Sequence, residues 1–276
     1  MMIAQGEIAM TALSAVFEGL VFDAENASST GGKQGPVVIT FIGSGGKTSL
    51  IWMLARNLAK SARETAVQRK ILVTPTTKMF PPQPNNCCDH YYTEIPAKAA
   101  PGITLAGIYN KKTGKLESFA MPELERLAAF YDLVLIEGDG SRELPLKGWT
   151  DYEPVVPSWT DWTVGIVPLW LLGTPISDKI IHRLPQFCAL CGAQPGAPLT
   201  TAHLAQVISG NAKNPAQRSL FSAAQGNRML FLNQSGINEL AQSKEIIGLL
   251  PDECRLNLRR IISGNTQQDA VYGFTP

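Results

Sequence analysis

The sequence predicts an α/β protein with a mostly parallel β-sheet flanked by helices on both faces. Short continuous runs of β-branched and aliphatic residues recur along the chain, and such runs are typical of strands buried on both faces of a parallel sheet. Segments with apolar residues at helical spacing alternate with these runs, as in successive βαβ units. Several runs end directly in glycine-rich or acidic loops, where an open parallel sheet binds its ligands.

The expected elements follow one another in chain order. Apolar spacing predicts a helix over residues 7–23, and the small, polar segment 26–35 predicts a loop. The run VVITFI at 37–42 predicts the first strand, and the apolar face of residues 50–59 predicts the helix that follows. Another helix is expected at 122–130, and further strands are expected at 70–74, 131–136, 162–167 and 228–232. We expect one domain over 1–276, with this N-terminal helix and a more helical C-terminal part.

The balance of charges excludes several classes of protein. The chain carries 24 Lys+Arg and 23 Asp+Glu, and 45% of its 276 residues are hydrophobic, whereas a disordered chain would be less hydrophobic and more highly charged. A protein that binds nucleic acid through its phosphates usually has a basic excess, which is missing here. No apolar run approaches the ~18–20 residues of a membrane span. We therefore expect neither nucleic acid nor a membrane as a partner.

The N-terminus and the cysteines indicate a cytoplasmic protein. Residues 1–20 contain no Lys or Arg, so the basic segment of a signal peptide is missing. The five cysteines follow no regular disulfide framework. Cys188 and Cys191 form a C-x-x-C pair downstream of His182, and a metal or redox site is the alternative to buried helical cysteines. The oligomeric state stays open.

The strongest functional signal is a glycine-rich loop between the first strand and its helix. Glycines let backbone N–H groups approach phosphate oxygens without a Cβ clash, and a helix N-terminus favours anions. Lys47 can neutralise the β- and γ-phosphates, and the Thr48 hydroxyl can bind Mg²⁺. The candidate nucleotide-binding residues of this loop are Gly43, Ser44, Gly45, Gly46, Lys47, Thr48 and Ser49.

The loop is shorter than the usual phosphate-binding pattern. That pattern, G-x-x-x-x-G-K-[ST], would place a glycine at Phe41, whereas this chain has G-x-x-G-K-T from Gly43 to Thr48. A similar short loop, G-T-N-G-K-T, occurs in Mur-type ligases and folylpolyglutamate synthetases. A glycine-rich turn with an incidental lysine is the alternative. The strand before the loop and the helix after it favour a phosphate loop, and with it a P-loop NTPase-like fold.

A second group of polar residues follows the strand at 131–136. Glu137 and Asp139 stand where P-loop proteins hold Mg²⁺, so one carboxylate can bind the metal while the other orients water or substrate. A Gly-Asp-Gly turn that closes a strand is the alternative. Arg142 and Lys147 come next, either as contacts to phosphates or an anionic substrate or as ordinary surface charges. The candidate catalytic residues are Lys47, Glu137 and Asp139, and the candidate metal ligands are Thr48, Glu137 and Asp139.

Three segments together resemble the YqeC family of accessory proteins associated with selenium-dependent molybdenum hydroxylases. They are VVITFIGSGGKTSL, ILVTPTTKM and IEGDGSRELPLKGWTDYEPVVP, within a match over about residues 37–233. The resemblance implies a P-loop fold, a nucleotide ligand and a role in maturing a molybdenum hydroxylase. The cofactors would be ATP or GTP with Mg²⁺, and the molybdenum cofactor or the hydroxylase itself would be a partner.

One segment departs from the family pattern. The family tends to show L-N-[QK]-x-D at residues 232–236, but Gly236 replaces the acid that reads guanine in GTP-binding proteins. Asn233 remains a candidate base contact, with a polar turn after a strand as the alternative. Thr76 and Thr77 end the strand at 70–74 and are candidates to face the γ-phosphate or a second substrate.

Four tryptophans follow the acidic loop. Their size favours packing in a core or over the sheet edge, and a pocket or partner surface for a flat cofactor is the alternative. They are Trp149, Trp159, Trp162 and Trp170.

Three functions fit these features. The leading hypothesis is an Mg²⁺-dependent accessory protein that binds and hydrolyses a nucleoside triphosphate during maturation of, or cofactor insertion into, a molybdenum hydroxylase. The second is a non-catalytic switch, in which nucleotide orders the loop 137–147 for delivery of a cofactor to a partner. The third is a small-molecule kinase or ligase, suggested by the short loop, although Mur-type ligases need further domains for which 276 residues leave little room.

Overall fold

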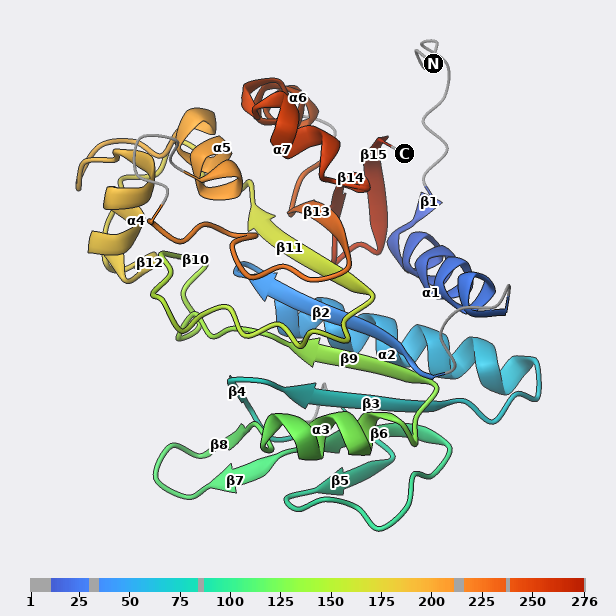
Figure 1. The fold of residues 1–276 in the computed structure, drawn as a ribbon. Coiled ribbons are helices and arrows are strands. Elements are labelled where there is room, and N and C mark those ends of the chain that lie inside the picture. Colours follow the sequence, from blue (N-terminus) through green and yellow to red (C-terminus); the bar gives the residue numbers. More distant parts are fainter. Residues whose placement is uncertain (1–10, 30–34, 84–86, 211–215, 237–238, 276) are drawn as a thin grey trace.

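A ten-stranded sheet forms the centre of the molecule (Figure 1). The structure, a computed structural model, describes residues 11–29, 35–83, 87–210, 216–236 and 239–275. The strand order is β1-β15-β14-β13-β11-β2-β9-β3-β6-β5. Neighbours from β14 to β5 are parallel, and β15 is antiparallel to both β14 and β1. The strands are β1 (Thr11–Ala12), β2 (Val37–Gly43), β3 (Lys70–Pro75), β5 (His90–Tyr92), β6 (Gly102–Ala106), β9 (Leu133–Glu137), β11 (Trp162–Pro168), β13 (Asn227–Asn233), β14 (Arg260–Asn265) and β15 (Ala270–Thr275).

Helices cover both faces of this sheet, as the sequence predicts. Ile39 and Phe41 of β2 pack with α1 and α2 on one face, while Val38 packs with α3 and Ile42 packs with α4, α5 and α6 on the other. Successive residues alternate because side chains of a strand have a period of two. The helices are α1 (Leu13–Ser29), α2 (Lys47–Glu64), α3 (Met121–Ala128), α4 (Leu184–Cys191), α5 (Thr201–Ser209), α6 (Leu240–Leu249) and α7 (Asp252–Leu256).

The five strands expected from apolar runs are all present. They are β2, β3, β9, β11 and β13, and they lie side by side in the middle of the sheet. The helix after the glycine-rich loop is α2, whose predicted apolar face is buried at Leu50, Ile51, Leu54 and Leu58. The helix predicted at 122–130 is α3, one residue earlier at its start and two shorter at its end. Long apolar patterns therefore located the central elements correctly.

The prediction for the N-terminal helix is corrected in its bounds. The helix α1 begins at Leu13, not at residue 7, and continues to Ser29 through residues assigned to a loop. Residues 1–10 and 30–34 lie outside the described residues. Leu13, Phe17 and Leu20 are buried in the cluster that includes α2, and this packing outweighs the low helix propensity of the polar residues that follow.

Apolar runs did not reveal the outer strands or two small sheets. Strands β5, β6, β14 and β15 extend the main sheet, and the small sheets are antiparallel β4-β8-β7 and parallel β10-β12. Two- and three-residue strands are too short to show a period. Their bounds are β4 (Lys78–Met79), β7 (Ile108–Asn110), β8 (Lys115–Glu117), β10 (Leu146–Lys147) and β12 (Ile181–His182). Among the described residues, none of the helices is both long and apolar enough to cross a membrane.

Candidate functional site

The carboxyl ends of β13, β11, β2, β9 and β3 meet along one edge of the sheet, on the side of β10 and β12 in Figure 1. A cavity of about 860 Å³ opens at this edge. Loops after β2 and β9 line it, together with residues of β4, β8 and β12 and the turn after β11. The predicted site residues that line it are Gly45, Gly46, Lys47, Thr48, Ser49, Thr77, Glu137 and Arg142.

The glycine-rich loop packs tightly against two neighbouring strands. Gly43 and Gly46 have φ angles of +93° and +129°, a conformation that residues with a side chain rarely adopt. A Cβ atom on Gly43 would lie 2.3 Å from the carbonyl oxygen of Ile166, and one on Gly46 would lie 2.3 Å from Nδ2 of Asn233. The glycines are therefore required by close backbone approach as well as by conformation.

Lys47 is buried at the first position of α2. Its Nζ atom donates to the carbonyl oxygen of Gly43 and lies 3.1 Å from Oδ1 of Asp139. Ser44, in the same loop, is also buried. The loop, the lysine and the N-terminus of α2 present their positive charge to the same cavity.

Thr48 lies in the first turn of α2 and faces Glu137, the last residue of strand β9. The Thr48 hydroxyl donates to Oε2 of Glu137 over 2.8 Å. Burial raises the pKa of Glu137 above its ordinary value, while the nearby Lys47 and the Thr48 hydroxyl lower it. An alcohol oxygen and a buried carboxylate at the cavity wall are hard oxygen donors of the kind that Mg²⁺ takes.

Asp139 does not occupy the position expected of a metal ligand. It is fully buried and does not line the cavity. Its Oδ2 atom accepts hydrogen bonds from the Gly43 amide (3.1 Å) and the Trp149 indole (2.9 Å). Burial raises its pKa, but Lys147 and Lys47 outweigh burial and hold the pKa of Asp139 below its ordinary value. The two carboxylates therefore differ in place: Glu137 lines the cavity, whereas Asp139 supports the glycine-rich loop from behind.

Lys147 is likewise buried rather than available to a ligand. Its side chain has no exposed surface, and Nζ contacts the Gly140 carbonyl (2.6 Å), Oε2 of Glu153 (2.8 Å) and Oδ2 of Asp139 (3.2 Å). Arg183 donates to the same Oε2 atom of Glu153 over 2.7 Å. Burial opposes ionisation of Glu153, yet Arg183 and Lys147 hold its pKa below the ordinary value. The result is a network of alternating charges beneath the loop after β9.

Asn233 and Thr76 also support the site through backbone contacts. The side-chain amide of Asn233 donates to the Gly45 carbonyl (2.7 Å), and its Oδ1 atom accepts from the amide (3.1 Å) and hydroxyl (2.9 Å) of Thr266. The Thr76 hydroxyl donates to the carbonyl of Val155 over 2.6 Å. Neither side chain lines the cavity, and both bond backbone groups of neighbouring loops. A contact between either residue and a nucleotide stays a prediction. Thr77 does line it, and its buried hydroxyl has no hydrogen-bond partner among the described residues.

Left-handed backbone conformations concentrate around this cavity. Six described residues other than glycine have positive φ angles, and four of them line the cavity. Such conformations cost of order 1 kcal/mol or more each, persist only where the surroundings enforce them, and cluster at functional sites. The four are Arg142, Glu143, Arg183 and Gln234.

Strand pairing around the cavity brings together residues that lie far apart in the chain. Strand pairing of β10 with β12 places Lys147 beside His182, which is 35 positions away in the chain, and no periodicity relates such positions. Burial, with Arg183, Lys147 and Arg142 nearby, lowers the pKa of His182 to about 4.

The tryptophans differ in their surroundings. Trp149 and Trp162 are buried, as expected for a core, but Trp170 is 52% exposed and lines the cavity.

Cys188 and Cys191, the C-x-x-C pair, both lie in helix α4. Cys191 is buried, donates from Sγ to the Phe187 carbonyl, and has its pKa raised to about 11 by burial. Burial also raises the pKa of Cys188. Within the part of the chain that the structure describes, three or more His, Cys, Asp or Glu side chains never gather in a way that could hold a metal ion. Both thiols therefore belong to the packing of α4.

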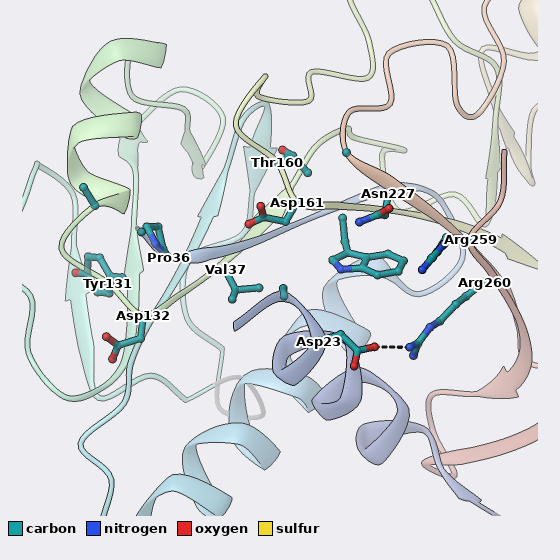
Figure 2. Close-up of a pocket in the computed structure, with 15 residues that line it drawn as sticks. Asp23, Pro36, Val37, Tyr131, Asp132, Thr160, Asp161, Asn227, Arg259 and Arg260 are labelled. Atoms are coloured by element: carbon teal, nitrogen blue, oxygen red, sulfur yellow. Dashed lines mark hydrogen bonds and ion pairs between the residues drawn. The ribbon is translucent and has the colours of Figure 1, made fainter. Parts of the chain in front are cut away.

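A second cavity, of about 1000 Å³, opens at the amino ends of the strands (Figure 2). Its carboxylates have structural partners: Asp161 accepts from the Val38 amide and Asp132 from the Lys70 amide, each at the start of a strand. Asp23 of α1 forms an ion pair with Arg260, as the dashed line in Figure 2 shows. This cavity lies at the amino ends of the strands, at the opposite end of the sheet from the glycine-rich loop.

Comparison with known proteins gives one family. The family described as YqeC protein matches residues 39–185. The chain is 30% identical over 223 residues to the uncharacterized protein YqeC of Escherichia coli (strain K12), a match that covers 78% of this chain and 83% of the relative. No solved structure shows a significant match to the chain.

Proposed function

The chain belongs to the YqeC family, and we propose that it binds a magnesium nucleoside triphosphate, ATP or GTP, at the carboxyl edge of its sheet. The observation that carries this proposal is the pairing of the Thr48 hydroxyl with Glu137 beside Lys47. A cation for phosphate and two oxygen donors for Mg²⁺ thus stand at one cavity wall. The order β13-β11-β2-β9-β3, with the acidic strand next to the glycine-loop strand, supports a P-loop NTPase-like fold.

The glycine-rich loop would bind the phosphates. Gly45 and Gly46 line the cavity at the N-terminus of the 18-residue helix α2, whose free N–H groups and dipole favour anions. The Gly43 and Ser44 amides are bonded to Asp139 and to the Ile166 carbonyl, so they shape the loop. On binding, the Lys47 ammonium would exchange its contact with the Gly43 carbonyl for a phosphate oxygen. Asp139 and Asn233 keep the loop in place from behind, so little reorganisation is needed.

Thr48 and Glu137 would hold Mg²⁺. Both oxygen donors line the cavity, and Mg²⁺ is usually bound by one or two protein oxygens together with phosphates and waters. The ion would supply charge neutralisation to the phosphates. It would also lower the pKa of Glu137, which burial raises in the protein alone.

The base would lie toward Trp170 and Gln234. These residues follow the adjacent parallel strands β11 and β13, which are in register at Pro168 and Asn233. Both line the cavity beside the phosphate loop. A half-exposed indole offers a face on which any nucleobase stacks, and the buried Gln234 Oε1 atom has no hydrogen-bond partner among the described residues.

The cellular role that we propose is maturation of, or cofactor insertion into, a molybdenum hydroxylase. The resemblance to accessory proteins of selenium-dependent hydroxylases supports it. In that role the nucleotide would be hydrolysed, with Glu137 as the carboxylate that faces the γ-phosphate region. Asp139, which is fully buried, would act through the position of the glycine-rich loop.

Calorimetry with the full chain tests this proposal. We expect Mg²⁺ with ATP or GTP to bind the wild type and Lys47→Ala to abolish binding, with Lys60→Ala, an exposed lysine of the same helix, as the matched control. Release of phosphate from the bound nucleotide would show hydrolysis. Equal nucleotide affinity of Lys47→Ala and the wild type would reject the site, and a bound nucleotide that stays intact with a molybdenum-cofactor extract present would favour a switch.

A further inference from the structure

We propose that the same cavity binds a second ligand, one that carries a phosphate group, through Arg142 and Arg183. This inference rests on the proposed function, because it assigns residues 43–48 to the nucleotide and the two arginines to a separate substrate. The cavity would then bind two ligands side by side, the nucleotide and a phosphorylated compound.

The charges that line the cavity favour an anion beyond the triphosphate. Five lysines and arginines line it, against three glutamates: Lys47, Lys78, Lys115, Arg142 and Arg183, and Glu137, Glu143 and Glu153. Glu137 bonds the Thr48 hydroxyl, and Glu153 bonds both Lys147 and Arg183. Two of the three carboxylates are thus engaged, and Lys47 belongs to the nucleotide loop. Lys78 forms an ion pair with Glu117 over 2.8 Å. Lys115, Arg142 and Arg183 therefore remain as the cations that face the cavity from other elements.

Arg183 is held in a fixed orientation at the cavity wall. Its Nη1 atom donates to Glu153 over 2.7 Å, and its guanidinium lies 5.6 Å from the centre of the Tyr152 ring. Glu153 is fixed in turn by the buried Lys147. A guanidinium has five N–H donors, so donors remain for a ligand, and its planar fork matches two oxygens of a phosphate.

Arg142 reaches the cavity from a tight turn in the loop after β9. The Leu144 amide donates to the Ser141 carbonyl over 3.0 Å, and the two central residues, Arg142 and Glu143, have φ angles of +52° and +67°. Turns of this kind usually contain Asn and Gly at these positions. Arg142 is exposed and forms no ion pair with any described residue.

His182 lines the same cavity as Arg142 and Arg183. Arg183, Lys147 and Arg142 all act on this imidazole and, with burial, lower its pKa. His182 is therefore uncharged at neutral pH, and it can donate a hydrogen bond to a phosphate without adding a positive charge that the arginines would repel. The loop after β9 and strand β12 together form a cationic wall that is separate in the chain from the nucleotide loop.

Titration of inorganic phosphate into the Lys47→Ala variant tests this inference. The substitution removes the cation of the nucleotide loop and leaves the cationic wall intact. We expect this variant to bind phosphate, and we expect a further Arg142→Gln or Arg183→Gln substitution to weaken that binding at least tenfold. Arg126→Gln, at an exposed arginine of α3, is the matched control and should change nothing. Acetate should bind more weakly than phosphate.

Separate outcomes would overturn the two proposals. The second subsite is rejected if Lys47→Ala binds no phosphate, or if Arg142→Gln leaves phosphate binding unchanged. It is also rejected if Arg142→Gln weakens a non-hydrolysable Mg²⁺–ATP analogue instead of phosphate, because Arg142 would then be a nucleotide contact. The proposed nucleotide site is rejected if the wild-type protein binds no nucleotide. Thermal melting of each variant shows that it is folded, which matters most for Arg183→Gln because Glu153 loses a partner.

Discussion

The Nζ atom of Lys147 lies 3.2 Å from Oδ2 of Asp139, and neither side chain has any exposed surface. Because Asp139 also accepts the Gly43 amide, this pair connects the loop after β9 to the base of the glycine-rich loop. The sequence leaves Lys147 open as a ligand contact or a surface charge, and the structure pairs its charge with Asp139 and Glu153 inside the protein. A buried pair of this kind is costly to break, because the remaining buried charge loses compensation. Without Lys147, Asp139 would keep only Lys47 as a nearby cation among the described residues.

We expect Lys147→Met to lower the free energy of unfolding by about 3 kcal/mol. Asp139 and Glu153 would lose their shared cation, but Lys47 and Arg183 would still compensate them in part. Urea denaturation of the two proteins measures the difference. Lys60→Met provides the control, since Lys60 and Glu64 form an exposed pair 3.8 Å apart that is worth about 1 kcal/mol or less. A loss for Lys147→Met no larger than the control would show that the buried network does not stabilise the fold.

Asn233→Ala should weaken the phosphate loop from behind. The variant removes the hydrogen bond to the Gly45 carbonyl and leaves Thr266 without its acceptor, a loss of about 1–3 kcal/mol of stability for the unsatisfied buried groups. Nucleotide affinity should fall as well, although Asn233 does not line the cavity. A normal affinity in a destabilised variant would mean that the loop keeps its shape without this anchor.

Glu137→Gln should raise the melting temperature of the ligand-free protein. Burial raises the pKa of Glu137, and a carboxyl whose folded-state pKa is raised destabilises the fold once the pH exceeds its unfolded value, so a neutral amide relieves this cost. The same change should weaken Mg²⁺-dependent nucleotide binding at least tenfold. Calorimetry with and without Mg²⁺ checks the second effect, and equal affinity in both proteins would contradict the proposed metal ligand.

Stability should fall as the pH decreases from about 6.5 toward 4. His182 has its pKa lowered to about 4, so in this window the unfolded chain binds a proton that the folded protein does not, which favours unfolding. The imidazole is partly exposed, and solvent screening limits the effect to about 1 kcal/mol. Denaturation at pH 7 and pH 4.5 should show a smaller difference for His182→Gln than for the wild type or the control His90→Gln on β5. If the stability difference between pH 7 and pH 4.5 were identical in all three proteins, a group other than His182 would cause it.

Trp170→Ala should show whether Trp170 contacts the base of the nucleotide or only affects binding of its phosphates. If the half-exposed indole stacks on the base, the variant loses about 1–3 kcal/mol of affinity for a nucleoside triphosphate, whereas inorganic tripolyphosphate should bind as before. Phe130→Ala, at an exposed phenylalanine that does not line the cavity, is the control. A parallel loss for both ligands would indicate that Trp170 shapes the loop instead of contacting a base.

Much of the central fold could be predicted because its signals are local. The buried runs of β2, β3, β9, β11 and β13 and the apolar face of α2 depend on residues close together in the chain. The outer strands and the small sheets were missed because they are short or mixed in polarity, and only pairing with distant partners makes them strands. Burial of Leu13 and Phe17 against α2 likewise moved the bounds of α1.

The sequence by itself determined the phosphate-loop pattern, its strand and helix, and the acidic residues at the next strand end, because spacing along one segment defines all of them. Only the tertiary structure decided which carboxylate faces the cavity. In a continuous strand Glu137 and Asp139 would point the same way, but β9 ends at Glu137. The chain then turns so that Glu137 meets Thr48, while Asp139 turns inward to Gly43 and Lys147. That division depends on strands that pair across the sheet, and no local pattern records it.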